Sequence, residues 1–332
     1  MAHSRPIAVA VLGDGGWGTT LAIHAFRLGH RVSWWGAFPA YLRVLERRRE
    51  NVKFLPGVRI PRQLRVTADL SRALEGARLV ILAIPSQYLR AVIRQLKRTP
   101  LAGMAFLSVA KGLERGTLKR MSELVHEELG RVPLAILSGP NIASEIARDQ
   151  PASSVVASRD PRMARAVQRW LMSERLRLYT SEDVIGVELG GALKNPIAIA
   201  AGIGDGLGFG ANTKAALITR GVVEMARLGV AMGAAAQTFW GLSGLGDLVT
   251  TCLSGRNRRL GEQLGGGRPL QAVLESTPMV LEGVETARAA LALGRRYRVE
   301  LPIVEQVCAV LFRRRPPRQA LHALMLRPGR VE

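Results

Sequence analysis

The chain has 332 residues, with 47 Lys and Arg against 26 Asp and Glu, which gives a formal net charge of +21. Hydrophobic residues make up 48% of it, a globular balance that excludes wholesale disorder, and the length predicts two domains. Two cysteines, Cys252 and Cys308, cannot form a disulfide framework, so we expect a reducing compartment, the cytoplasm. We expect no signal peptide, no integral membrane segment and, because the five histidines are scattered, no metal site.

The charge excess is almost entirely arginine, since only six of the 47 basic residues are lysine. Such an excess is compatible with a nucleic-acid or anionic-membrane partner, with steering of a small anionic substrate, or with a drift of composition. The sequence contains no nucleic-acid recognition motif, few aromatic side chains to stack on bases and no clear basic amphipathic segment. We therefore expect no nucleic-acid partner, and peripheral association with an anionic membrane stays an alternative that the sequence does not support.

The first 180 residues alternate predicted strands with predicted helices. Ile7–Leu12 is a continuous apolar run, typical of a strand buried on both faces, and it is followed by a predicted helix over Thr19–Leu28 and a strand over His30–Trp35. Further strands are expected over residues 78–84, 105–109, 134–137 and 155–157. This alternation predicts an α/β fold with a Rossmann-type, doubly wound, mostly parallel sheet, whose ligands bind at the carboxyl ends of the strands.

Strand signals end near residue 180. Val184–Ile203, Asn212–Leu228 and Val284–Tyr297 predict helices, and Pro196 is expected to kink or break the first of them. The sequence therefore predicts a dinucleotide-binding domain over residues 1–180 and an all-helical substrate domain over residues 181–332.

A glycine-rich turn follows the first predicted strand. Gly13-x-Gly15-x-x-Gly18 lies between a strand and a helix, which is the context that a dinucleotide-binding fingerprint requires. Gly13 permits a tight turn, Gly15 lets the backbone approach a pyrophosphate, and Gly18 lets the helix pack closely on the strand. An NAD site usually adds an acid near the end of the second strand. No acid stands between Asp14 and Glu46, which argues against strict NAD preference and mildly for NADP.

Two lysines stand out in this arginine-rich chain. Lys111 lies just past a predicted strand, and Lys194 lies among small apolar residues. A buried lysine can exchange a proton, whereas arginine stays charged, so both are candidates for proton transfer; the alternative is a lysine on a helix surface. Downstream, Gly244–Asp247 and the basic run Gly255–Arg259 suit an anionic ligand that arginine could bind bidentately, the alternative being a surface loop.

Together these residues make the chain resemble, from end to end, the bacterial-type NAD(P)-dependent glycerol-3-phosphate dehydrogenase family. The resemblance implies reversible reduction of dihydroxyacetone phosphate to sn-glycerol 3-phosphate for glycerophospholipid synthesis, with NAD or NADP as cofactor and a small-molecule phosphate as substrate; a homodimer is left open. The motifs that carry it are GDGGWGTTLA (13–22), N-x-x-x-LPG (51–57), SVAKGLE (108–114), LSGPNIASEIA (137–147), GVELGGALKNPIAIAAGIGDGLGFGANTKAALITRG (186–221), GLSGLGDLVTTC (241–252), RNRR (256–259) and EGVETA (282–287).

The same resemblance implies roles for individual residues. Lys194 would be the general acid/base at the ketone oxygen, and Lys111 would contact both substrate and cofactor and stabilise developing negative charge. Further cofactor contacts would come from Gly13, Gly15, Gly16, Trp17, Gly18, Ala143, Arg256, Val280 and Glu282. Further substrate contacts would come from Gly139, Asn141, Asp247, Gly255, Arg256 and Asn257.

Three positions depart from the family pattern. Gly16 stands where the family commonly has serine, and Gly255 replaces the serine before Arg-Asn in a shortened segment that begins at Cys252. Ala37 follows Trp-Gly where the family usually has arginine or histidine. Because Ala37 removes the cation expected for a 2′-phosphate, the choice between NADH and NADPH stays open at the level of the sequence.

Overall fold

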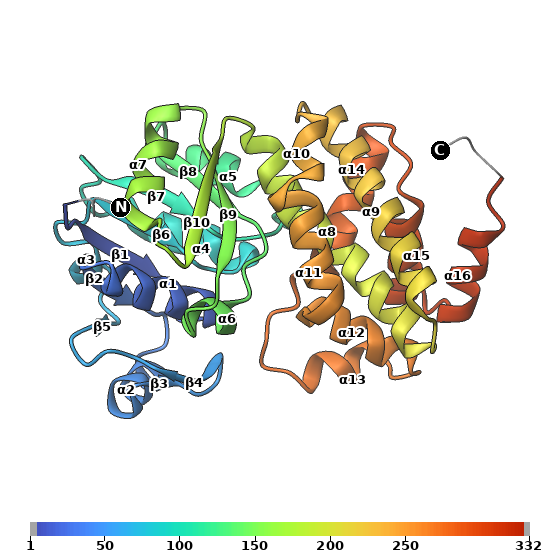
Figure 1. Cartoon of the computed structure of the whole chain (residues 1–332), viewed down its shortest axis with the longest axis horizontal. Coiled ribbons are helices and arrows are strands. Elements are labelled where there is room, and N and C mark those ends of the chain that lie inside the picture. The colour runs from blue at the N-terminus through green and yellow to red at the C-terminus, as the bar shows by residue number, and fades with distance from the viewer. Residues whose placement is uncertain (1–4, 329–332) are drawn as a thin grey trace. The chain divides into compact units, whose positions relative to one another are not determined.

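The computed structural model describes residues 5–328, which fall into two compact units (Figure 1). Unit 1 ends at Val184 and lacks Gly112–Lys119; unit 2 comprises that short segment and the chain from Ile185 onward. The expected domains, residues 1–180 and 181–332, have one boundary in the chain, whereas the chain passes between the units more than once. The boundary at residue 180 therefore stays a prediction.

Unit 1 is built on an eight-stranded sheet with the order β10-β9-β8-β7-β6-β1-β2-β5. All neighbouring strands are parallel except β8 and β9, so the predicted mostly parallel Rossmann-type sheet is confirmed. The sequence missed β10 because its side chains alternate between buried and exposed positions, and it missed β5 because it is only three residues long. The strands are β1 (Ala8–Leu12), β2 (Arg31–Trp35), β5 (Arg65–Thr67), β6 (Leu79–Leu82), β7 (Ala105–Ser108), β8 (Leu134–Ser138), β9 (Ala152–Ala157) and β10 (Leu176–Ser181).

Seven helices and a small hairpin complete the described part of unit 1. The first helix, α1, begins at Gly16, three residues before the predicted start, because the extended Gly15 acts as its N-cap. The hairpin pairs β3 (Glu50–Asn51) with β4 (Leu55–Arg59). The helices are α1 (Gly16–Arg27), α2 (Pro39–Arg48), α3 (Leu70–Leu74), α4 (Ser86–Leu96), α5 (Met121–Leu129), α6 (Ala143–Ala147) and α7 (Pro161–Leu171).

The regular structure of unit 2 is entirely helical over its described residues, as predicted. Its central helix α8 (Val184–Gly206) runs through Pro196 without ending, so of the two expected effects of this proline, a kink or a break, the break does not occur. This helix is long and apolar enough to pass as a membrane span, but 89% of that stretch is buried inside the protein. The other helical elements are α9 (Ala211–Ala231), α10 (Ala236–Trp240), the π-helical turn η1 (Leu242–Gly246), α11 (Asp247–Ser254), α12 (Arg256–Gly265), α13 (Leu270–Glu275), α14 (Glu282–Arg296), α15 (Pro302–Arg313) and α16 (Pro317–Met325).

Glycines on α8 and α12 let these two helices approach each other very closely. A Cβ atom at Gly202 of α8 would lie 1.9 Å from the carbonyl oxygen of Arg258 on α12. Reciprocally, a Cβ atom at Gly261 of α12 would lie 2.1 Å from the carbonyl oxygen of Ile199 on α8. Gly202 and Gly261 are therefore required by the backbone-to-backbone packing of these two helices.

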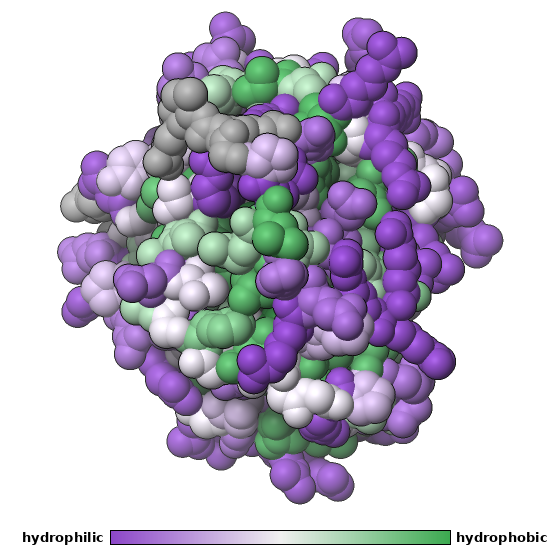
Figure 2. All heavy atoms as spheres, turned by 90° about the vertical axis from the view of Figure 1, so that its right-hand side faces the viewer, coloured by the Kyte–Doolittle hydropathy of each residue, from purple (hydrophilic) through white to green (hydrophobic). Residues whose placement is uncertain are grey.

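Charged side chains lie mostly at the surface, and Figure 2 shows a face on which hydrophilic side chains surround smaller hydrophobic patches. The charged side chains that are buried are exceptions, because burial of an ionisable group is costly unless it is paired or hydrogen-bonded. Among them are Arg120, Glu128, Lys194, Glu224 and Asp247.

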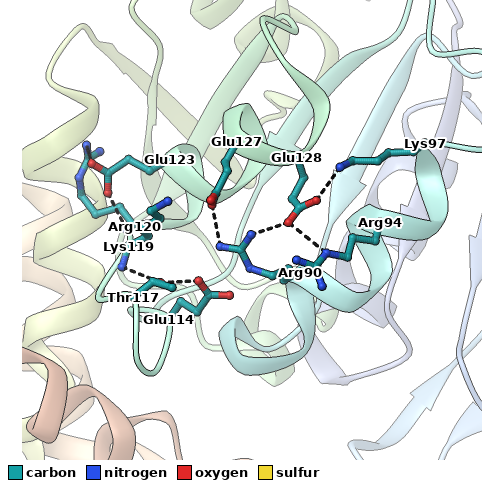
Figure 3. Close-up of polar contacts among 10 residues, drawn as sticks. All are labelled: Arg90, Arg94, Lys97, Glu114, Thr117, Lys119, Arg120, Glu123, Glu127 and Glu128. Carbon is teal, nitrogen blue, oxygen red and sulfur yellow. Dashed lines mark hydrogen bonds and ion pairs between the residues drawn. The ribbon is translucent and has the colours of Figure 1, made fainter.

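Glu128 shows how unit 1 compensates a buried charge. Figure 3 shows its carboxylate on α5 facing three cations at the end of α4. It accepts hydrogen bonds from Lys97 Nζ at 2.7 Å, from Arg94 Nε at 3.1 Å and from Arg90. These bonds, that of Lys97 first, lower the pKa of Glu128 from 4.5 to about 2. The cluster therefore joins α4 to α5 through an ionised carboxylate.

The depressed pKa of Glu128 predicts a pH-dependent contribution to stability. Its stabilisation is fully present above the unfolded-state pKa and is lost as the pH falls toward about 2, where the folded carboxylate takes up a proton. We expect Glu128→Gln to lower the Tm at neutral pH and to flatten the fall of Tm below about pH 5. Thermal denaturation across pH measures this. Glu127→Gln, which removes an exposed carboxylate bonded to Arg90, is the matched control. An unchanged pH slope in Glu128→Gln would contradict the assignment.

Candidate functional site

The glycine-rich turn of unit 1 has the geometry of a dinucleotide cradle. Gly13 has φ +124°, and a Cβ atom there would lie 2.3 Å from the carbonyl oxygen of Ala83 after β6. A Cβ atom at Gly18 would lie 2.1 Å from the carbonyl oxygen of Gly13, whereas one at Gly15 would meet no atom within 4 Å. Two of the glycines thus allow close packing of β1, β6 and α1, and Gly15 borders open space.

The N-terminus of α1 is suited to bind phosphate. Gly15 caps this helix without a side-chain hydrogen bond, and its first turn contains no acid. The free backbone N–H groups and the positive end of the helix dipole can therefore bind a pyrophosphate. Trp17 Nε1 in the same turn is buried and has no hydrogen-bond partner among the described residues. The residues present fit a dinucleotide.

The hairpin explains why Gly16 replaces the usual serine. A Cβ atom at Gly16 would lie 2.5 Å from the carbonyl oxygen of Phe54, between β3 and β4. The hairpin also supplies Asn51, which the sequence assigned to no role. Asn51 Nδ2 donates to the carbonyl oxygen of Asp14 at 2.8 Å and to Thr19 Oγ1 at 2.7 Å. The Asn51 side chain thereby fixes the glycine-rich turn, and the N-x-x-x-LPG motif was its sequence signal.

A second group of predicted residues lies at the carboxyl ends of β7 and β8. Lys111 Nζ donates to the carbonyl oxygen of Gly139 at 2.8 Å. Gly139 has φ +145°, and a Cβ atom there would lie 2.9 Å from Ser154 Cα, so only glycine fits. Asn141 Oδ1 accepts a hydrogen bond from Ser154, while its Nδ2 is buried without a partner among the described residues. The structure therefore brings Lys111, Gly139 and Asn141 together.

Ala143, a predicted cofactor residue, lies beside the glycine-rich turn. It begins α6, and its carbonyl oxygen accepts a hydrogen bond from Thr20 Oγ1 on α1 at 3.0 Å. The Cβ atom of Ala143 would lie 3.9 Å from a Cβ atom at Gly16. Helix α6 thus borders the predicted phosphate site within unit 1.

In unit 2, Lys194 lies at the centre of a buried polar cluster. Its Nζ donates to Asp247 Oδ1 at 2.5 Å and to Thr251 Oγ1 at 2.7 Å. Lys194 is 6% exposed and Asp247 1% exposed, so two opposite charges are removed from water together. The carboxylate compensates the ammonium, and the hydroxyl group fixes its direction. The alternative of a surface lysine is wrong for Lys194.

The Gly-Leu-Gly-Asp segment is not the surface loop of the alternative interpretation, because it forms the π-helical turn η1 and continues into α11. A Cβ atom at Gly244 would lie 2.1 Å from the carbonyl oxygen of Phe239. A Cβ atom at Gly190 on α8 would lie 2.5 Å from the carbonyl oxygen of Ser243 in η1. These close approaches bring Asp247 to Lys194. Such π-helical turns frequently mark functional sites.

The position of Thr251 also explains why glycine, and not the usual serine, stands at position 255. A Cβ atom at Gly255 would lie 2.6 Å from Thr251 Cγ2 and 2.7 Å from the carbonyl oxygen of Thr251. A serine there would collide with the residue that contacts Lys194. The sequence did not single out Thr251, because threonine in a helix gives no signal of a partner 57 positions away.

Asn257 links the starts of two helices to α8. Its Nδ2 donates to Asn195 Oδ1 at 2.9 Å, and its Oδ1 accepts a hydrogen bond from the backbone N–H of Gly283 at 3.1 Å. Arg256 and Glu282 begin α12 and α14, respectively, and Val280 precedes α14. The predicted residues Arg256, Asn257, Val280 and Glu282 therefore belong to one region of unit 2, in which Asn257 has a positioning role.

Two family models cover nearly the whole chain. The model of the N-terminus of NAD-dependent glycerol-3-phosphate dehydrogenase matches residues 8–164. The model of the C-terminus of the same family matches residues 183–322.

Similar proteins agree with these family models. The glycerol-3-phosphate dehydrogenase (NAD(P)+) of Desulfitobacterium hafniense is 47% identical over 98% of this chain and 92% of its own. That of Moorella thermoacetica is 48% identical over 97% of this chain and 96% of its own. The solved glycerol-3-phosphate dehydrogenase of Coxiella burnetii superposes with a TM-score of 0.94 at 36% identity, covering 97% of this chain and 99% of that one. The chain belongs to the NAD-dependent glycerol-3-phosphate dehydrogenase family.

Proposed function

We propose that the protein catalyses the reversible reduction of dihydroxyacetone phosphate to sn-glycerol 3-phosphate with a hydride from NAD(P)H. The product supplies glycerophospholipid synthesis. The observation that carries the proposal is the buried cluster of Lys194, Asp247 and Thr251 in a chain of this family. It provides a positioned proton donor, which reduction of a ketone requires.

Reduction breaks the C=O π bond and forms one C–H and one O–H bond. The nicotinamide, when bound, supplies the hydride that forms the C–H bond. The Lys194 ammonium donates the proton that forms the O–H bond, and in the reverse direction the neutral amine accepts the hydroxyl proton. Asp247 and Thr251 hold Nζ in position while it does so.

The other predicted residues divide the remaining tasks. Lys111, fixed by the Gly139 carbonyl, is proposed to contact substrate and cofactor and to stabilise the negative charge that develops on the ketone oxygen. The unpartnered Asn141 Nδ2 offers a hydrogen bond to the substrate. Arg256 is proposed to bind the substrate phosphate, because a guanidinium can bind phosphate bidentately. The proposed cofactor residues are Gly13, Gly15, Gly16, Trp17, Gly18, Ala143, Val280 and Glu282.

Initial rates with each cofactor test the activity as a whole. Purified protein should oxidise NADH or NADPH when dihydroxyacetone phosphate is added, with sn-glycerol 3-phosphate as the product. Absorbance at the nicotinamide band follows the rate, and chromatography identifies the product. If neither cofactor supports turnover, the proposal is wrong.

Replacement of Lys194 tests the proton donor. We expect Lys194→Ala to lower kcat by about 100- to 10,000-fold, the range for loss of a general acid, with little change in the circular dichroism spectrum. Lys97→Ala, which removes a lysine of unit 1 from the Glu128 cluster, is the control and should keep its kcat. A Lys194→Ala enzyme with near-normal kcat would assign the acid to another residue.

We infer a cytoplasmic location from the state of the cysteines. Both are free and buried. Burial raises the pKa of the Cys252 thiol to about 12 and that of the Cys308 thiol to about 11, so neither is an activated thiolate. Two unpaired thiols support a reducing compartment.

We further propose that the protein is a homodimer that pairs through unit 2. A surface hollow beside α9 and α10 is lined by Arg227, Val230, Trp240, Arg298 and Glu300, among others. Trp240 is 52% exposed and Val230 49% exposed, which leaves apolar surface in water. Because this face carries both charge signs, it can pair with the same face of a second copy in a two-fold interface.

A charge placed on this face tests the dimer. Light scattering after size exclusion should give the mass of two chains for the wild type and of one chain for Trp240→Glu, because a carboxylate cannot be buried unpaired. Tyr179→Glu, at an exposed aromatic residue of unit 1, is the control and should stay dimeric. A monomeric wild type, or a dimeric Trp240→Glu, would refute the proposed interface.

A further inference from the structure

Asp14 is an acid inside the glycine-rich turn. It follows β1 by two residues and lies between Gly13 and Gly15. The turn requires small residues for close packing and free N–H groups for phosphate, and neither requirement calls for a carboxylate. Asp14 therefore has a task that the phosphate site does not explain.

The side chain of Asp14 reaches the carboxyl end of the neighbouring strand β2. A Cβ atom at Gly36, the first residue after β2, would lie 2.7 Å from Asp14 Oδ2 and 2.9 Å from Asp14 Cβ. The end of this strand is where an NAD site places the acid that binds the adenosine ribose. The sequence lacks an acid in this strand, but the fold brings a carboxylate there from the first turn.

One oxygen of this carboxylate also lacks a hydrogen-bond partner among the described residues. That oxygen is Asp14 Oδ2, which is buried. Burial raises the pKa of Asp14, while its own backbone N–H and the charge of Lys53 act in the opposite direction. A buried acceptor without a donor is rare in folded proteins and calls for an explanation, and a ligand hydroxyl at the end of β2 would supply the donor.

The surrounding residues hold Asp14 in this place. Asn51 Nδ2 binds the Asp14 carbonyl oxygen, and Tyr41 Oη in turn donates to Asn51 Oδ1 at 2.6 Å. Leu42 closes the other side, since its Cδ2 would lie 2.6 Å from a Cβ atom at Gly36. Position 36 must therefore be glycine to leave room for the carboxylate.

The cation that would favour a 2′-phosphate is missing at position 37, where the family usually has arginine or histidine. Ala37, directly after Gly36, carries no charge. Arg49, one of the nearby arginines in sequence, donates instead to the carbonyl oxygens of Pro61 at 3.4 Å and Leu64 at 3.2 Å. The acid at this end of β2 is Asp14, and the cation whose charge acts on it is Lys53, whose Nζ lies 5.0 Å from the centre of the Phe54 ring in the hairpin.

We propose that Asp14 determines cofactor specificity, by accepting a hydrogen bond from a hydroxyl of the adenosine ribose and repelling a 2′-phosphate, so that the enzyme prefers NADH to NADPH. The inference rests on the proposed function, because it assumes a dinucleotide on the glycine-rich turn. It also reverses the mild expectation of NADP that the missing acid in β2 suggested.

Binding titrations without substrate test the inference separately from turnover. Calorimetry gives the Kd of NADH and of NADPH for wild type, Asp14→Ala and Asp14→Asn. We expect the Kd of NADPH to exceed that of NADH by about tenfold or more in the wild type. In Asp14→Ala this ratio of Kd values should fall by about tenfold or more. Asp14→Asn keeps the size but not the charge, and should recover NADPH binding. If Asp14→Ala does not fold, the comparison of Asp14→Asn with the wild type is the test.

Glu46→Ala is the matched control, because it removes the next acid along the chain, which is exposed on α2. Its NADPH-to-NADH ratio of Kd values should equal that of the wild type. Equal or tighter binding of NADPH by the wild type, or an unchanged ratio in both Asp14 variants, would overturn the inference. A protein that shows the expected ratios but never reduces dihydroxyacetone phosphate would instead refute the proposed function.

Discussion

The buried ion pair between Lys194 and Asp247 constrains the rest of unit 2. An ammonium in a helix of small apolar residues needs a compensating charge, because loss of one partner of such a pair costs about 3–5 kcal/mol. The partner comes from α11, which η1 brings against α8 through close approaches at Gly190 and Gly244. Thr251 completes the cluster from the next turn of α11. Gly190, Gly244, the π-helical turn and the missing side chain at Gly255 thus all contribute to holding one ammonium group.

In unit 1 the feature that favours ligand binding is a set of buried polar groups without partners in the described part of the chain. Its sheet leaves polar groups at the carboxyl ends of its strands without partners, instead of satisfying each of them within the protein. Asp14 Oδ2 after β1, Ser108 Oγ at the end of β7 and Ser138 Oγ at the end of β8 are all buried without a hydrogen-bond partner among the described residues. Parallel sheets bind ligands at this edge, so a bound dinucleotide and substrate would explain these groups.

The sequence predicted what depends on local pattern. Continuous apolar runs located β1 and β6 to β8, and the strand-turn-helix context identified the glycine-rich turn. Lys194 stood out because lysine is rare in this chain and lies among small residues. What it could not supply depends on distant partners: Asn51 acts on a turn 37 positions earlier, and Thr251 acts on a lysine in another helix. The proposed ribose-binding acid gave no sequence signal, because such an acid usually follows β2, whereas this carboxylate comes from the turn after β1. Short helices such as α10 and α13 contain too few residues for a clear hydrophobic period.

The claim that Lys194 and Asp247 act as one unit is tested most directly by a double-mutant cycle on kcat with dihydroxyacetone phosphate and the preferred cofactor. The cycle compares wild type, Lys194→Ala, Asp247→Asn and the double variant, each checked for folding by circular dichroism. If Asp247 acts through Lys194, the double variant is about as slow as Lys194→Ala alone, because the carboxylate has nothing left to position. If instead the fold decreases in kcat of the two single variants multiply in the double variant, the two residues act independently, and the ion pair does not hold the proton donor in position.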